Sequence, residues 1–214
     1  MNADVAGVDG CRGGWVVATL HGWRVIPSFA TIAREFLLIG VDMPIGLPDD
    51  RRRDADDAAR QYIRPRGSCV FPTPPRAIVE HDDYAVANAA SKATFGVGLT
   101  RQTFNLFPKI RDVDSVIDAT TQHRFLEVHP ECSFRAMTGR VLPPKRTAGG
   151  RDQRRLALEA VFGPIERRPS SARPDDVLDA YAVLWTALRH RRGESETLGG
   201  GGVDGRGLVM RIVV

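Results

Sequence analysis

Two apolar runs of this chain each end on an aspartate, and this is the feature that most restricts its fold. Residues 5–9 read VAGVD, and residues 37–42 read LLIGVD. Near-continuous apolar character predicts strands that are covered on both faces, as in the middle of a sheet flanked by helices. If the two strands are parallel neighbours, Asp9 and Asp42 emerge at one edge of the sheet, separated by a strand spacing of about 5 Å.

The other predicted elements complete an α/β order. Glycine-containing turns separate the first three strands and are typical of an antiparallel meander. Strands are predicted at residues 5–9, 15–20, 23–29, 37–41 and 124–128, with an edge strand at 208–214. Helices are predicted at residues 31–36, 49–65, 84–95 and 100–119, after Pro130, at about 152–162 and after Pro174. A helical crossover joins the third strand to the fourth, which predicts a sheet of mixed direction.

The length and composition are those of an ordinary globular protein. The 214 residues suit a single domain, residues 1–214, with a helical insertion at about 49–120 between the fourth and fifth strands. A net charge of +4 fits a polyanionic partner without requiring one. Because Cys11, Cys69 and Cys132 are far apart in sequence, we expect reduced thiols. The absence of a long apolar run or signal-peptide pattern predicts a cytoplasmic protein with no membrane segment.

Further acidic residues follow the predicted strands and begin the last helix. Two carboxylates as close as Asp9 and Asp42 cannot both stay ionised cheaply, and a divalent cation between them reverses that penalty. Mg²⁺ or Mn²⁺ suits such a site, since each takes carboxylate oxygens and leaves positions for water and phosphate. The candidate catalytic acids are Asp9, Asp42, Glu127, Glu131, Asp176 and Asp179, of which Asp9, Asp42, Glu127 and Asp179 are the predicted metal ligands.

Each acid also has a structural interpretation. A strand-end aspartate is commonly a turn former, and Asp175 and Asp176 are good residues for a helix N-terminus. Glu131 directly follows Pro130 and suits the first turn of a helix, which favours Glu127 slightly as the ligand, while His129 suits a turn. The choices between Glu127 and Glu131, and between Asp176 and Asp179, stay open. The whole set of acids in this strand order, rather than any single member, favours a metal site.

Seven ordered sequence blocks resemble one family. They are GVDGCRGGW, IGVDMPIGLP, CVFPTPPR, GLTRQTFNLFPKIRDVD, EVHPECSFRAMTG, PPKRTAGGRDQRR and DDVLDAYAV. Nearly the whole chain is similar to the DUF429 family, a domain of unknown function whose members are predicted ribonuclease H-like nucleases. The resemblance implies a ribonuclease H-like mixed sheet of five strands in the order 3-2-1-4-5, with strand 2 antiparallel and helices on its flanks. It matches Asp9 and Asp42 to the acids of the first and fourth strands.

The last helix carries a second likeness. Its D-x-x-D-A pattern resembles that of Holliday-junction resolvases and matches Asp176, Asp179 and Ala180. The EVHPE block, which holds Glu127 and Glu131, has no firm counterpart in those enzymes. The resemblance therefore leaves the arrangement of metal ligands open at the fifth strand.

Basic residues in or beside these blocks are candidates for phosphate contacts. They are Arg76, Lys109, Lys145, Arg146, Arg151 and Arg154, of which Arg76, Lys109, Lys145 and Arg151 are the predicted substrate-binding residues. Lys145 and Arg151 are favoured because they lie in a glycine-containing loop at a helix start. Ordinary solvated charge is the alternative for each.

The function that these patterns predict is metal-dependent phosphodiester hydrolysis. The expected partner is DNA, RNA or a nucleotide-like substrate, and a carboxylate-held site of one or two metal ions would carry the reaction. One alternative is an ATP-using phosphotransferase of the actin and sugar-kinase type, because GVDGCRGG resembles a first phosphate loop. The other is a non-catalytic nucleic-acid-binding module. A homodimer is possible by analogy with resolvases.

Overall fold

The central sheet has the predicted strand order. A computed structural model describes residues 4–50, 52–167 and 170–214. The five strands are β1 (Val5–Cys11), β2 (Gly14–Thr19), β3 (Gly22–Ile26), β4 (Leu38–Val41) and β5 (Phe125–Glu127). Their order is β3-β2-β1-β4-β5, with β2 antiparallel to both neighbours and the β1–β4 and β4–β5 pairs parallel. This confirms the mixed α/β sheet of ribonuclease H-like topology.

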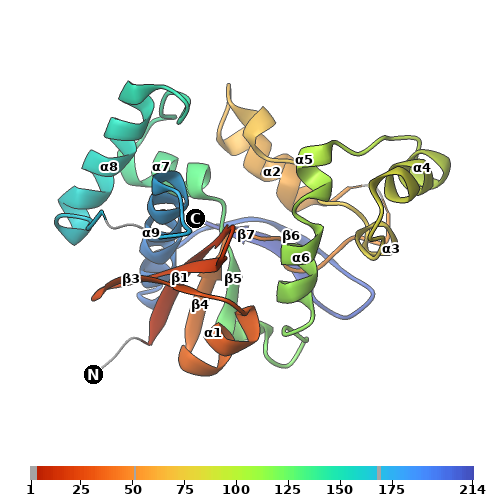
Figure 1. Cartoon of the computed structure of the whole chain (residues 1–214), viewed down its shortest axis with the longest axis horizontal. Helices are drawn as coiled ribbons and strands as arrows, with labels where there is room; N and C mark the ends of the chain where they lie inside the picture. The colour runs from red at the N-terminus through yellow and green to blue at the C-terminus, as the bar shows by residue number, and fades with distance from the viewer. Residues whose placement is uncertain (1–3, 51, 168–169) are drawn as a thin grey trace.

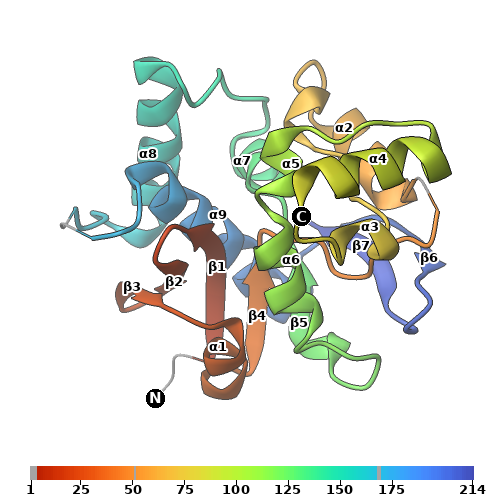
Figure 2. The ribbon, with the colours of Figure 1, turned by 45° about the vertical axis from the view of Figure 1, so that its right-hand side comes forward.

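Apart from the first helix, the helices of the described chain form two groups. The α-helices are α1 (Phe29–Glu35), α2 (Asp54–Tyr62), α3 (Arg76–Val79), α4 (Tyr84–Phe95), α5 (Arg101–Phe104), α6 (Phe107–Asp114), α7 (Pro130–Thr138), α8 (Ala148–Phe162) and α9 (Pro174–Arg191). Short 3₁₀ turns lie at η1 (Gly67–Cys69) and η2 (Gln122–Arg124). Helices α2 to α6 fall between β4 and β5, and Figure 2 shows them on the right, with α7, α8 and α9 on the left.

The two faces of β1 contact different layers of the fold. Ala6 and Val8 are fully buried in the apolar core that includes α1 and α6. Alternate residues point to opposite faces of a strand, so Gly7 faces the other side, where α9 packs. A Cβ on Gly7 would lie 2.1 Å from the backbone nitrogen of Leu184, and one on Gly40 of β4 would meet α9 in the same way. These glycines allow α9 to lie directly on the two central strands.

Three helix boundaries differ from the sequence prediction. The helix predicted at residues 49–65 begins only at Asp54. The pattern at residues 100–119 divides into α5 and α6, because Pro108 has no N–H to donate and sits in the first turn of α6. Helix α8 begins before residue 152, where the Thr147 hydroxyl caps it by accepting a hydrogen bond of 3.1 Å from the Gly150 amide.

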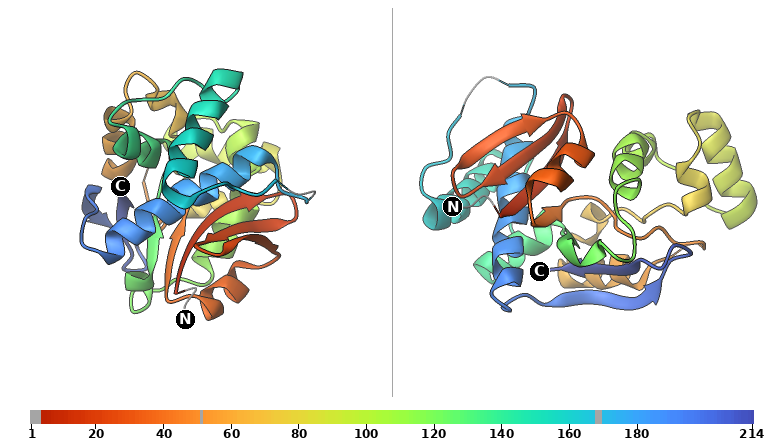
Figure 3. Two further views of the ribbon diagram at one scale, coloured as in Figure 1. Left: turned by 90° about the vertical axis from the view of Figure 1, so that its left-hand side faces the viewer. Right: turned by 90° about the horizontal axis from the view of Figure 1, so that it is seen from below.

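The C-terminal segment forms a hairpin rather than a lone edge strand. The predicted strand at residues 208–214 is β7 (Val209–Val213), and it pairs antiparallel with β6 (Thr197–Val203) from the glycine-rich tail. Val213 makes a single parallel bridge to Val128, just after β5. The hairpin packs against α2, as the lower edge of the right panel of Figure 3 shows. In the described part of the chain, no helix combines the length and apolarity needed to cross a membrane.

Candidate functional site

The strand register places Asp9 and Asp42 side by side. Val8 of β1 pairs with Val41 of β4, and the Asp42 amide donates a 2.9 Å hydrogen bond to the Val8 carbonyl. The two aspartates occupy the next positions on parallel strands about 4.8 Å apart. Each lies two residues after a glycine that faces α9, so Asp9 continues the α9 side of β1 and Asp42 that of β4. The sequence prediction of a shared sheet edge is therefore met.

The first turns of α9 bring two more acids to this edge. Asp176 and Asp179 lie three residues apart near the start of the helix, and both are buried. Together with Asp9 and Asp42 they line one cavity of about 470 Å³. Glu131 lines it too, so five of the six predicted acids converge in one cavity, although they span 170 positions of sequence.

Burial and mutual repulsion govern the electrostatics of these acids. Burial, followed by the Asp42, Asp179 and Asp176 carboxylates, raises the pKa of Asp9 well above its usual range. Burial and then the Asp179 carboxylate raise the pKa of Asp42 to about 8. The pKa of Asp179 is also raised, chiefly by burial. Carboxyls with raised pKa values bind either a proton or a cation, which makes these residues candidates for a functional site.

The hydrogen bonds of the four acids differ. Asp9 accepts one from its neighbour, the Gly10 amide, at 2.8 Å. Asp176 accepts two from Arg173, at 2.9 Å from the backbone nitrogen and 3.1 Å from Nη2, so it closes the helix N-terminus. Within residues 4–50, 52–167 and 170–214, no donor reaches either carboxylate oxygen of Asp42. Asp42 is therefore the least compensated carboxylate of the cavity.

The structure places Glu127 in a structural ion pair. Its Oε2 accepts hydrogen bonds from the Ile45 amide at 2.7 Å and from Arg53 Nη1 at 2.9 Å, while Arg53 Nη2 contacts Oε1. Arg53 is 1% exposed and also contacts Asp56. Glu127 does not line the cavity of the four aspartates. Both of its oxygens are held, so the structure does not bring this predicted ligand to the site.

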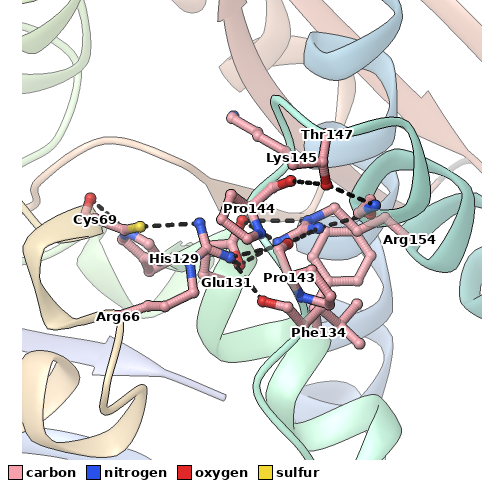
Figure 4. Close-up of polar contacts among 12 residues, drawn as sticks. Arg66, Cys69, His129, Glu131, Phe134, Pro143, Pro144, Lys145, Thr147 and Arg154 are labelled. Atoms are coloured by element: carbon pink, nitrogen blue, oxygen red, sulfur yellow. Dashed lines mark hydrogen bonds and ion pairs between the residues drawn. The ribbon is translucent and has the colours of Figure 1, made fainter.

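Glu131 lines the cavity but is also held by arginines. Its carboxylate receives hydrogen bonds from Arg154 at 2.6 to 3.2 Å and from Arg66 Nη1 at 3.1 Å. The same guanidinium groups donate to loop carbonyls, Arg154 to Pro143 at 2.8 Å and Arg66 to Leu142 at 2.9 Å (Figure 4). Glu131 and Arg154, a predicted phosphate contact, together fix this loop.

The predicted substrate-binding residues separate into two groups. Lys109 and Lys145 line the cavity, and Lys145 Nζ donates a 2.6 Å hydrogen bond to Asp179 Oδ2. Arg76 lies elsewhere, paired with Asp114 and, at 2.6 Å, with Asp204. Its guanidinium is therefore occupied in the fold.

Arg151 differs from both lysines in its position. It is exposed in the first turns of α8 and does not line the cavity. Arg146, another predicted phosphate contact, is likewise exposed and outside the lining.

Several lining residues were not among the predicted site residues, and three of them, Arg66, His129 and Arg173, carry basic side chains. Arg66 and Arg173 add positive charge at the cavity, and His129 lines the same cavity as Asp42. The His129 Nε2 is 3.4 Å from the Cys69 carbonyl, and burial lowers the pKa of the ring. Arg173 immediately precedes the PDD sequence that begins the last helix, so its place beside the acids could have been predicted from sequence. Arg66 stands in a proline-interrupted loop with no such pattern.

The donor chemistry of the cavity fits Mg²⁺ or Mn²⁺. Carboxylate oxygens are hard ligands, and these ions commonly bind through one or two carboxylates with water or phosphate at the other positions. Asp42 with two free oxygens and Asp9 with one are the best placed. In the residues that the structure describes, no group of three or more His, Cys, Asp or Glu side chains is arranged to enclose an ion. The cavity therefore suits an open, water-rich cation site rather than a closed cage.

The fold and the acidic cavity define a mixed α/β protein of ribonuclease H-like topology with a cluster of carboxylates at its sheet edge. The chain belongs to the DUF429 family, which is described as a protein of unknown function and matches residues 7–201. Comparison with curated proteins finds no match, and neither does comparison with solved structures.

Proposed function

We propose that the protein is a divalent-metal-dependent nuclease that hydrolyses phosphodiester bonds in nucleic acid. The observation that carries the proposal is the convergence of Asp9, Asp42, Asp176 and Asp179 in one cavity of about 470 Å³. Asp176 has a structural role at the start of α9, but gathering four carboxylates at one place is costly. A bound divalent cation would offset that repulsion, and a cation-dependent reaction would explain why the carboxylates are kept together.

The chain's own residues divide between holding the cation and holding the phosphate. Asp9 and Asp42 would bind Mg²⁺ or Mn²⁺, with Asp179 completing the site, and the bound ion would activate a water and neutralise charge on the leaving oxygen. Lys109 and Arg173 line the same cavity and would contact phosphate oxygens. Asp176 holds the start of α9 through Arg173 and so positions Asp179.

The shape of the surface favours a polymeric substrate over a single nucleotide. The acidic cavity shares Phe71, Gln102 and Leu106 with a second cavity of about 410 Å³. That one shares Arg60 and Thr100 with a third, of about 280 Å³. These shared lining residues make the three cavities neighbours along the insertion, and neighbouring cavities can hold successive nucleotides of one strand.

Cleavage assays on Asp42→Asn test the proposal. Labelled single-stranded, duplex and branched DNA and RNA are incubated with wild type and variant in Mg²⁺, Mn²⁺ or chelator. We expect cation-dependent cleavage by wild type and a loss of 100-fold or more in the variant, which keeps the shape of the side chain but not its charge. Asp152→Asn, an exposed acid on α8, is the matched control and should cleave normally.

Two outcomes would contradict the proposal. Cation-dependent cleavage that is equal in Asp42→Asn and wild type would show that the activity arises elsewhere. Nucleic-acid binding without cleavage on any substrate would favour the non-catalytic binding module instead.

A further inference from the structure

The Lys145 ammonium already occupies part of the acidic cavity. Its Nζ lies 2.6 Å from Asp179 Oδ2, and burial of Asp179 makes this a charge-assisted contact in a partly desolvated place. Burial and the neighbouring carboxylates raise the pKa of Asp9 and of Asp42, and the Lys145 charge offsets part of that rise at both carboxyls. The Lys145 ammonium thus pairs with Asp179 and stabilises the charged forms of Asp9 and Asp42.

The loop that carries Lys145 is held in place from two sides. Arg154 Nη1 donates to the Pro143 carbonyl at 2.8 Å, and Thr147 Oγ1 donates to the Pro144 carbonyl at 2.8 Å (Figure 4). A Cβ on Gly150 would lie 2.2 Å from the Pro144 carbonyl oxygen, so the loop rests directly on the start of α8. Lys145 is therefore presented to Asp179 by a fixed backbone, unlike an ordinary surface lysine.

The ion pairs of the four aspartates leave two of them without a cation. Four ionised carboxylates carry four negative charges, of which Arg173 offsets one at Asp176 and Lys145 offsets one at Asp179. Two negative charges remain, centred on Asp9 and Asp42. One divalent cation neutralises them, whereas a second would add to the positive charge of Lys109 and of the two arginines that pair with Glu131.

We propose that Lys145 is a built-in second cation, so that the site takes one divalent ion between Asp9 and Asp42 rather than two. This inference rests on the proposed function, because it concerns the same cavity. It assigns Lys145 a role at the carboxylates, where the sequence predicted a phosphate contact. Lys145 holds an oxygen of Asp179 that a second ion would need.

Titration of the metal-free full chain with Mn²⁺ by calorimetry tests this. Wild type should bind one Mn²⁺, and Lys145→Met, which keeps the length of the side chain without its charge, should bind two. Lys145→Arg restores a positive charge and should return to one. Lys92→Met removes an exposed lysine of α4 and should match wild type. Circular dichroism verifies that each variant is folded.

The outcomes separate the two proposals. Two Mn²⁺ ions in wild type, or one in Lys145→Met with unchanged affinity, would overturn the role of Lys145 and leave the cation site intact. No Mn²⁺ binding by any variant would overturn the cation site itself, and the proposed function with it.

Discussion

Gly7 of β1 lies directly against the backbone of Leu184 in α9, where an added Cβ would come within 2.1 Å of the Leu184 nitrogen. This contact sets the distance of α9 from the sheet. It therefore sets how close Asp179, on the first turns of the same helix, comes to Asp9 on the same strand. The candidate site depends on a residue that has no side chain.

Gly7→Ala should strongly destabilise the fold. The obstructing atoms are backbone atoms of α9, which cannot move aside singly, so we expect a loss of about 3 kcal/mol or more in the free energy of unfolding. Gly10→Ala is the matched control, because its Cβ would meet only ordinary contacts at 3.7 Å. Urea unfolding of both variants measures the difference. Equal stabilities would contradict the close approach of α9.

Sequence was sufficient for the sheet and for the pair at its edge. Asp9 and Asp42 end two apolar strands, and alternation along a strand is a local rule, so register and parallel pairing follow once the strands are neighbours. The division of residues 100–119 into two helices was harder to predict from sequence. Pro108 indicated a break, but a proline also fits a first turn, and the packing of Phe107 in the core decides where α6 begins.

The choice among the acids was not accessible from sequence. Arginine partners distinguish Glu127 and Glu131 from the aspartates, and those partners come from distant segments. Arg53 lies 74 residues from Glu127, and Arg66 lies 65 residues from Glu131. Long-range ion pairs leave no local pattern, so a strand-end glutamate looks the same whether it binds a cation or an arginine.

The Arg53–Glu127 pair should affect the stability of the fold but not the binding of metal. Arg53→Met leaves the buried carboxylates of Asp56 and Glu127 without their shared cation, which should cost about 3–5 kcal/mol. Glu127→Gln leaves Arg53 paired with Asp56 and should cost less, about 1–3 kcal/mol. Urea unfolding measures both. Calorimetry should show wild-type Mn²⁺ binding in Glu127→Gln, and lost binding with unchanged stability would restore Glu127 as a ligand.

Asp42 should make the metal-free protein less stable as pH rises. Burial raises its pKa to about 8, so between about pH 4, the ordinary carboxyl range, and pH 8 the folded state keeps a proton that the unfolded chain has lost. Stability from this group is therefore full below pH 4 and declines up to pH 8, by at most about 1.4 kcal/mol per pH unit.

Asp42→Asn removes that dependence, and comparison with wild type measures it. In chelator, the two proteins should unfold at similar urea concentrations at pH 4, and the variant should be the more stable at pH 8. Adding Mg²⁺ at pH 8 should stabilise wild type and leave the variant unchanged, because the ion replaces the proton at Asp42. A wild type that is as stable relative to the variant at pH 8 as at pH 4 would mean that Asp42 ionises normally.

The salt dependence of nucleic-acid binding gives a test of the cavity rim. The Arg173 side chain is 83% exposed and lines the cavity, so a phosphate backbone that enters can displace counterions there. Arg173→Gln keeps the backbone N–H that donates to Asp176. The variant should reduce the steepness of the plot of log K against log salt concentration by about 0.9 on duplex DNA, or about 0.7 on a single strand. Fluorescence anisotropy over a series of salt concentrations measures the slope.

Arg34→Gln is the matched control for this experiment, because it removes the same charge from an exposed position on α1, on the opposite face of the sheet from α9. Net charge then falls equally in both variants, and a general loss of attraction lowers both affinities alike. Only a phosphate bound at the cavity separates the two slopes. Equal slopes would place the nucleic acid on another face, away from the four aspartates.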